Sequence, residues 1–170
     1  VLTCAVRSPH ARAQAEYDID VFARGLAKPI PIAVEGYSGE VAQVLRFDLE
    51  IAGFKYVSET ESQYALTGAN NTQVEGRLLD NVSKSTKFAK AFSGGSPRTQ
   101  AHALADEVVQ AITGRRGIAR TKMAFKVARS GGSEVYIADY DGHNATSVTA
   151  DGSIVAAPCW TPGRRTLYYT

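Results

Sequence analysis

The stretch Ser130-Gly-Gly-Ser-Glu-Val-Tyr-Ile-Ala-Asp-Tyr-Asp-Gly-His-Asn144 decides the fold of the C-terminal part of this chain. Apolar residues alternate with other residues from Val135 to Tyr140, which is the period of a strand with one buried face. Asp141-Gly142 follows directly, and this dipeptide is a strong signal for the tight turn of a β-hairpin. The stretch therefore predicts a strand that ends in a hairpin turn.

Further strands are expected around this hairpin. Pro158-Cys-Trp-Thr-Pro162 places a tryptophan beside a turn, and Thr166-Leu-Tyr-Tyr-Thr170 is a second alternating run. The predicted strands are residues 122–129, 134–139, 145–149 and 166–170. Four strands in about fifty residues are typical of one blade of a β-propeller. One blade cannot close a ring, so the sequence predicts a truncated propeller.

The preceding part of the chain shows helical patterns among short strands. Residues 39–52 and 99–113 carry apolar stripes at helical spacing, and strands are expected at 17–22, 30–34, 54–57, 64–68, 74–79 and 86–92. This order predicts an α/β (α+β) fold, in which two helices cover one face of a mixed sheet. Pro31 within 30–34 indicates either a sheet edge or the start of a strand.

The predicted organisation has four parts. Ala13-Gln14-Ala15 precedes Glu16 and has the small-residue pattern of a signal-peptide cleavage site. Residues 1–15 are therefore expected to be the remnant of a signal peptide or a disordered tail. An α/β domain over 16–114, a linker over 115–121 and the propeller blade over 122–170 follow.

Composition narrows the classes of function. The chain has 170 residues and a formal net charge of +2, and Arg7 and Arg12 account for that excess. The near-neutral remainder argues against nucleic acid as the main partner, because phosphate binding needs a basic face. No stretch of about eighteen apolar residues occurs, so no membrane-spanning segment is predicted.

Candidate catalytic residues do not form a recognisable pattern. The histidines, His10, His102 and His143, lie far apart in sequence and are predicted to be surface residues. The acidic pairs Asp48/Glu50 and Asp106/Glu107 are predicted to lie off the core. The sequence therefore predicts a protein that is not an enzyme and that has no cofactor or metal site.

Two other features have plain structural interpretations. The stretch Asp139-Tyr-Asp-Gly-His-Asn144 superficially resembles a calcium loop, but its spacing fits a hairpin turn better. Of the cysteines Cys4 and Cys159, the latter is expected to fill space in the core beside Trp160.

Several short segments together carry a resemblance to a known family. They are Ile112-Thr-Gly114, Gly117-Ile-Ala-Arg-Thr-Lys122, Tyr136-Ile-Ala-Asp-Tyr-Asp-Gly-His-Asn144 and Pro158-x-Trp160-x-Pro162. In this combination the chain resembles the TolB family of the bacterial Tol–Pal system over residues 16–170. The resemblance implies an N-terminal α/β domain followed by the first blade of a propeller.

The resemblance also implies a role as a periplasmic adaptor that supports outer-membrane integrity and cell division and serves as a route for colicin import. It implies that an N-terminal strand binds a TolA-like inner-membrane protein, through Glu16, Tyr17, Asp18, Ile19, Asp20, Val21 and Phe22. A Pal-like lipoprotein is an expected partner only if the missing blades are present. The family's usual Trp-Ser-Pro-Asp-Gly turn reads Trp160-Thr-Pro-Gly-Arg164 here, so its aspartate is absent.

Two alternatives remain open from the sequence. The chain is the opening part of a propeller-containing hydrolase of the prolyl-peptidase type, whose Gly-x-Ser-x-Gly motif would lie beyond Thr170. Otherwise it is a structural or ligand-binding propeller fragment, because a fold by itself does not assign chemistry.

Overall fold

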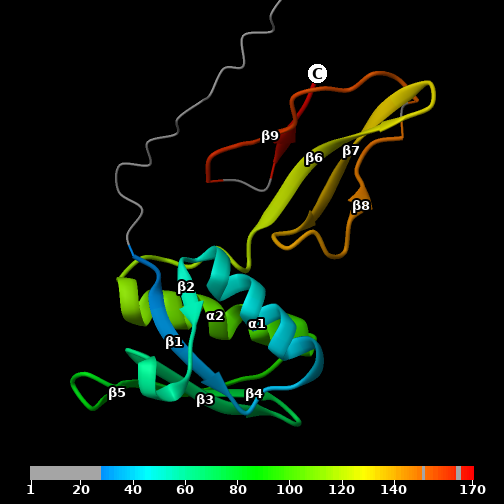
Figure 1. Cartoon of the computed structure of the whole chain (residues 1–170). Helices are drawn as coiled ribbons and strands as arrows, with labels where there is room; N and C mark the ends of the chain where they lie inside the picture. Colours follow the sequence, from blue (N-terminus) through cyan, green and yellow to red (C-terminus); the bar gives the residue numbers. More distant parts are fainter. Residues whose placement is uncertain (1–27, 151, 164–165) are drawn as a thin grey trace, which may run out of the picture.

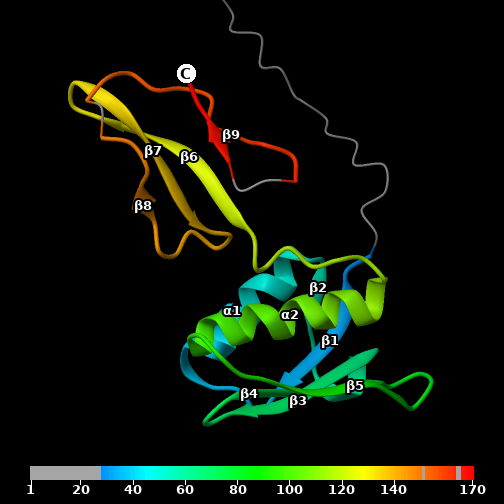
Figure 2. The same cartoon turned by 180° about the vertical axis from the view of Figure 1, so that it is seen from behind.

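In the described residues, two helices lie between a mixed β-sheet and a pair of smaller antiparallel sheets (Figure 1). The structure, a computed structural model, describes residues 28–150, 152–163 and 166–170. Figure 2 shows the same order of layers from behind. The elements in chain order are β1 Ile30–Glu35, α1 Gly39–Ile51, β2 Phe54–Tyr56, the 3-10 turn η1 Glu59–Glu61, β3 Tyr64–Asn70, β4 Val74–Asp80, β5 Ser85–Phe92, α2 Pro97–Thr113, β6 Lys122–Arg129, β7 Gly132–Asp139, β8 Thr146–Ser147, β9 Cys159–Trp160 and β10 Leu167–Tyr168.

The mixed sheet has the strand order β2-β1-β3-β4-β5. β1 runs parallel to both β2 and β3, whereas β3, β4 and β5 form an antiparallel meander. A β-bulge lies between β4 and β5 at Leu78/Leu79. Parallel neighbours need a crossover connection, and α1 supplies it between β1 and β2. The predicted α+β class, with a mixed sheet and two helices, is confirmed.

Local sequence explains where the helices begin and end. The Ser96 hydroxyl accepts a hydrogen bond from the Thr99 amide at 3.2 Å, so α2 begins at Pro97, two residues before the predicted start. Ser38 precedes α1, but its side chain makes no capping bond; instead its amide donates to Asn70 Oδ1 at 3.0 Å. Gly114 ends α2 in the left-handed conformation, with φ of 71°.

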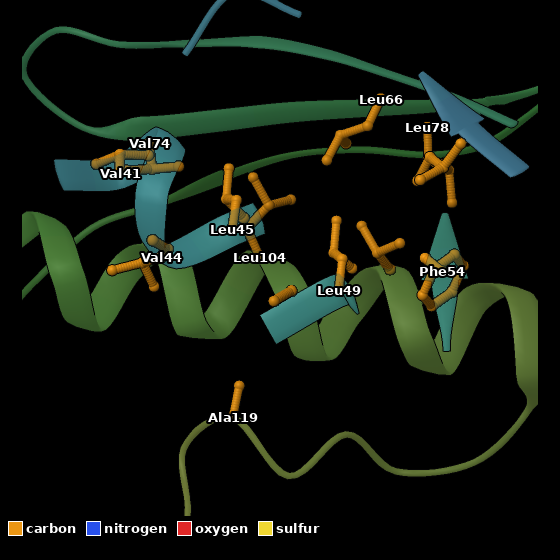
Figure 3. Close-up of a cluster of buried hydrophobic side chains, with 14 of the residues drawn as sticks. Val41, Val44, Leu45, Leu49, Phe54, Leu66, Val74, Leu78, Leu104 and Ala119 are labelled. Carbon is orange, nitrogen blue, oxygen red and sulfur yellow. The ribbon is translucent and has the colours of Figure 1, made fainter. Parts of the chain in front are cut away.

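The hydrophobic core fills the space between the mixed sheet and the helices (Figure 3). Leu104 of α2 is fully buried, and Gly76 of β4 leaves room for it, because a Cβ there would lie 2.5 Å from a Leu104 methyl. Ala119, which follows α2, belongs to the same buried cluster but lies on the side of α2 that faces away from the sheet (Figure 3). The fully buried leucines are Leu45, Leu49, Leu66, Leu78 and Leu104.

The C-terminal part forms two small antiparallel sheets rather than one of four strands. β6, β7 and β8 make the first sheet, while β10 pairs with β9 in the second. The turn after β9 accounts for this, because Gly163 takes a φ of 71° and Thr161 donates its amide to the Thr166 carbonyl at 2.9 Å. The last predicted strand therefore folds back on β9 and does not join β6–β8.

Two local predictions are also settled by the structure. Pro31 lies at the start of a strand and not at a sheet edge, since β1 has a neighbour on each side. Proline has no amide hydrogen to donate to a neighbouring strand. It is tolerated at position 31 because β3 begins to pair with β1 only at the next residue, where Tyr64 lies opposite Ile32. The prediction that Cys159 fills the core is wrong: the residue is exposed, because β9 has only two residues and one neighbouring strand.

Replacing Leu104 with alanine is expected to lower the free energy of unfolding by about 2–5 kcal/mol, because the side chain is fully buried between sheet and helices. Urea unfolding followed by circular dichroism measures this. Val82→Ala is the control, since Val82 is 76% exposed and its loss should change stability by less than about 0.5 kcal/mol. Equal effects of the two substitutions would contradict the described packing.

Candidate functional site

The turn that follows β7 touches the helical layer and forms a junction between the two parts of the fold. Tyr140 packs edge-on against Phe47 of α1, with ring centroids 6.2 Å apart. The Tyr140 amide donates to the Thr121 carbonyl at 3.1 Å, which fixes the turn to the start of β6. Gly142 donates to the Asp139 carbonyl at 2.8 Å, so the predicted hairpin turn is present.

Asp141 in this turn is the centre of the junction. Its side chain is only 5% exposed although it lies at the tip of a hairpin. Oδ2 accepts a hydrogen bond from the Arg98 guanidinium of α2 and lies 3.4 Å from His102 Nε2. Oδ1 accepts the amide of His143 at 3.0 Å. A buried carboxylate is stable only when paired, and these contacts provide the pairing.

His102 connects this turn to α1. Its Nδ1 lies 2.7 Å from Asp48 Oδ2, and both side chains are almost fully buried. The prediction of a surface position is therefore wrong for His102. Asp48 lies off the hydrophobic core, as predicted, but it is buried. The apolar stripes indicate which helix face meets the mixed sheet, but the C-terminal hairpin covers a second face. His143 is exposed, as predicted.

The charges around His102 influence its titration. Burial alone lowers the pKa of His102, but the hydrogen bond to Asp48 and the charges of Asp48 and Asp141 raise it by more. The pKa of His102 therefore lies above its usual value. Arg98 extends the network outward, because its second terminal nitrogen lies 3.1 Å from Glu40 Oε1 on α1.

A third buried carboxylate, Asp106, holds the segment that leaves α2. It accepts the Ala119 amide at 2.8 Å and the Arg120 Nε at 2.8 Å. Gly117 lies so close that a Cβ there would be 2.2 Å from Asp106 Oδ1. Asp106 also lies off the hydrophobic core, as predicted, but it is buried because residues 117–120 cover it. This packing anchors the segment that the sequence suggested was a linker.

The remaining carboxylate of the turn region, Asp139, is paired within the antiparallel sheet. Lys122 and Asn144 both donate to it, the latter at 2.7 Å. Burial raises the pKa of Asp139, but the hydrogen bonds from Lys122 and Asn144 lower it by more, so it lies below its usual value. In a calcium loop the Asp139 carboxylate would bind the ion, but here it accepts hydrogen bonds from Lys122 and Asn144.

A groove of about 560 Å³ lies beside the junction, between α1, α2 and the segment after α2. Its walls are mainly apolar, and Asp48 is one of the residues that line it. Asp48 Oδ1 has no hydrogen-bond partner among the described residues. Lining residues include Lys28, Ile30, Asp48, Val109, Ile118 and Tyr140.

The predicted partner-binding residues, Glu16 to Phe22, lie outside the described residues, as do Cys4 and His10. The junction was not anticipated from the sequence, although its Asp-Tyr-Asp-Gly turn had been singled out. One sequence signal for the junction is the presence of polar residues inside helical segments, at Asp48, His102 and Asp106. Neither described helix combines the length and apolarity needed to cross a membrane.

Comparison of the sequence with known proteins finds TolB proteins of several bacteria. No protein-family model matches the chain. The Tol-Pal system protein TolB of Geobacter sulfurreducens is 32% identical over 158 residues, which cover 75% of this chain and 36% of that protein. TolB of Bordetella avium is 28% identical and covers 92% of this chain and 43% of its own length. TolB of Histophilus somni is 43% identical over 75 residues, covering 42% of this chain and 17% of that protein.

A solved structure agrees with these relatives. The crystal structure of TolB from Acinetobacter baumannii superposes with a TM-score of 0.76 and covers 84% of this chain and 44% of that chain. Its sequence identity of 19% makes this a similarity of fold. The chain is TolB-like. This confirms the resemblance found in the sequence, and the chain spans less than half the length of these relatives.

The role of Asp106 can be tested with the substitution Asp106→Asn, which keeps the size of the side chain but removes its charge. Losing hydrogen bonds to a buried charge costs about 1.5–3 kcal/mol. The segment after α2 should then open more often, and trypsin should cleave after Arg115, Arg116 or Arg120 roughly tenfold faster. Mass spectrometry of the fragments gives the rate.

Glu107→Gln is the matched control for this experiment. Glu107 is the next residue of the same helix, but it pairs with Lys90 of β5 and not with the segment. It should leave the cleavage rate unchanged. Cleavage of Asp106→Asn at the wild-type rate would show that Asp106 does not anchor residues 117–120.

Proposed function

We propose that the chain acts as a TolB-like, non-enzymatic adaptor of a bacterial Tol–Pal system. In this role it binds other proteins of the periplasm and supports outer-membrane integrity and cell division. It also serves as a route for colicin import. The observation that carries the proposal is that the similarity to TolB proteins extends over most of the chain in both sequence and fold.

The layout of the described residues supports an adaptor. The helices are covered by the mixed sheet on one side and touched by the C-terminal hairpin on another, so the two parts of the fold are joined by specific contacts. His102 is flanked by the carboxylates of Asp48 and Asp141. The partners of His102 among the described residues are thus two carboxylates, with which an imidazole forms an ionic bridge, and not a hydroxyl or thiol that it would activate as a nucleophile.

The proposed contact with a TolA-like inner-membrane protein is the segment from Glu16 to Phe22. Its alternation of polar and apolar residues suits addition of a strand to a partner's sheet. In this mode the backbone supplies the hydrogen bonds and the alternating side chains set the register. Binding of a Pal-like lipoprotein belongs to this proposal only for a protein that carries the further blades.

Deleting residues 16–22 is expected to weaken binding to the purified periplasmic domain of a TolA-type partner at least tenfold, about 1.4 kcal/mol. Biolayer interferometry with the otherwise intact chain measures the dissociation constant. The control removes residues 2–8, a segment of equal length upstream of Glu16, and should bind like wild type. Full affinity after removal of 16–22 would rule out the strand role, and no binding by the wild-type chain would count against the adaptor proposal.

A further inference from the structure

We propose that His102 is a proton-dependent clasp that holds the hairpin turn after β7 against the helical layer. In its protonated form it bridges Asp48 of α1 to Asp141 of the turn. When it loses the proton, the bridge opens on one side and the turn separates from the helices more often. The proposal concerns how the two parts of the fold are held together and does not depend on the function proposed above.

The geometry supports a bridge with two arms. The ring nitrogens of His102 face different carboxylates: Nδ1 lies 2.7 Å from Asp48 Oδ2, and Nε2 lies 3.4 Å from Asp141 Oδ2. The side chains of Asp48, Asp141 and His102 are 1%, 5% and 6% exposed. A neutral imidazole carries one N–H and can donate to one carboxylate, whereas imidazolium donates to both. The bridge is therefore complete only in the charged form.

The Nε2 arm is the weaker one. It lies within ion-pair distance of Asp141, but among the described residues it makes no hydrogen bond. The attraction across 3.4 Å thus depends on the positive charge of the ring and not on a well-aligned hydrogen bond. Loss of the proton is expected to affect this contact first, because the Nδ1 hydrogen bond to Asp48 can persist in the neutral tautomer.

Charged groups from every neighbouring element act on His102. Asp48 faces it from α1, Asp141 from the turn, and Arg98 from its own helix, while Asp139 senses its charge from β7. Glu40 pairs with Arg98 on the outer side. Tyr140 of the same turn lies within electrostatic reach of Asp48.

These groups determine the direction of the effect. Asp48, Asp141 and Glu40 carry three negative charges, which Arg98 and protonated His102 balance in part. Without the His102 proton, Arg98 still pairs with Glu40 and Asp141, but the buried Asp48 carboxylate loses the positive charge that faces it. The pKa of His102 lies above its usual value of about 6.5, so its contribution to the junction is full at pH below 6.5. This contribution is lost as pH rises through the raised pKa.

The experiment is amide hydrogen exchange of the full chain by NMR between pH 5.5 and 8.5, expressed as protection factors so that the intrinsic pH dependence is removed. The reporters are Tyr140, whose amide bonds to Thr121, and Gly142, whose amide closes the turn. Their protection should fall at least threefold as pH rises. The midpoint should match the His102 ring titration, identified as the imidazole signal that disappears in His102→Gln. Leu66 and Leu78, in the core, should show no such change.

Variants separate the clasp from general stability. His102→Gln keeps a polar side chain without titration, so the reporters should become independent of pH and weakly protected. Arg46→Gln is the matched control, since the Arg46–Glu50 ion pair is exposed on α1, and it should behave like wild type. The proposal is overturned if wild-type protection does not change with pH, if its midpoint differs from that of His102, or if His102→Gln keeps the pH dependence.

A second variant keeps the test decisive if His102→Gln does not fold. Asp141→Asn removes one of the two carboxylates that face the ring, so the pKa of His102 should fall relative to wild type. The reporters should then lose protection at lower pH. An unchanged His102 titration in this variant would show that Asp141 does not sense the proton, which contradicts the bridge.

Discussion

A carboxylate that is removed from water must be paired, and this requirement determines how the two parts of this chain meet. Asp48, Asp106 and Asp141 are all buried at or near the far side of the helices, away from the mixed sheet. Each obtains partners from another part of the chain: Asp48 and Asp141 from α2, and Asp106 from the segment after α2. Because an isolated buried charge is costly, these pairings select one arrangement of the chain.

The helices consequently have two buried faces of different chemistry. The face toward the mixed sheet is apolar and contributes leucines and valines to the core. The other face is polar and receives the hairpin turn and the segment after α2. Burial of apolar surface is non-directional, whereas hydrogen bonds and ion pairs require a defined geometry. The first face therefore supplies cohesion, and the second orients the C-terminal sheets in this TolB-like fold.

The two faces also explain what the sequence could predict. Periodicity identified both helices and the strands of the mixed sheet, because apolar residues at Leu45, Leu49 and Leu104 mark the face toward the core. It placed His102 at the surface and Asp106 off the core, but it did not predict that both are buried, because a pattern of polar residues does not reveal a second covering layer. Arg98, which pairs with Asp141, lies 43 residues away in sequence, and no local signal indicates this pairing. The pairing of β10 with β9 was missed since two-residue strands carry no period.

The bulge between β4 and β5 has a consequence for behaviour at high concentration. β5 is the last strand of the described sheet and has eight residues, a length at which an open edge tends to recruit strands from other molecules. The irregularity at Leu78/Leu79 leaves Lys87 out of the pairing register and interrupts the flat hydrogen-bonding edge. Together with the charges of Lys87 and Lys90, it disfavours edge-to-edge aggregation while leaving the interior of the sheet regular.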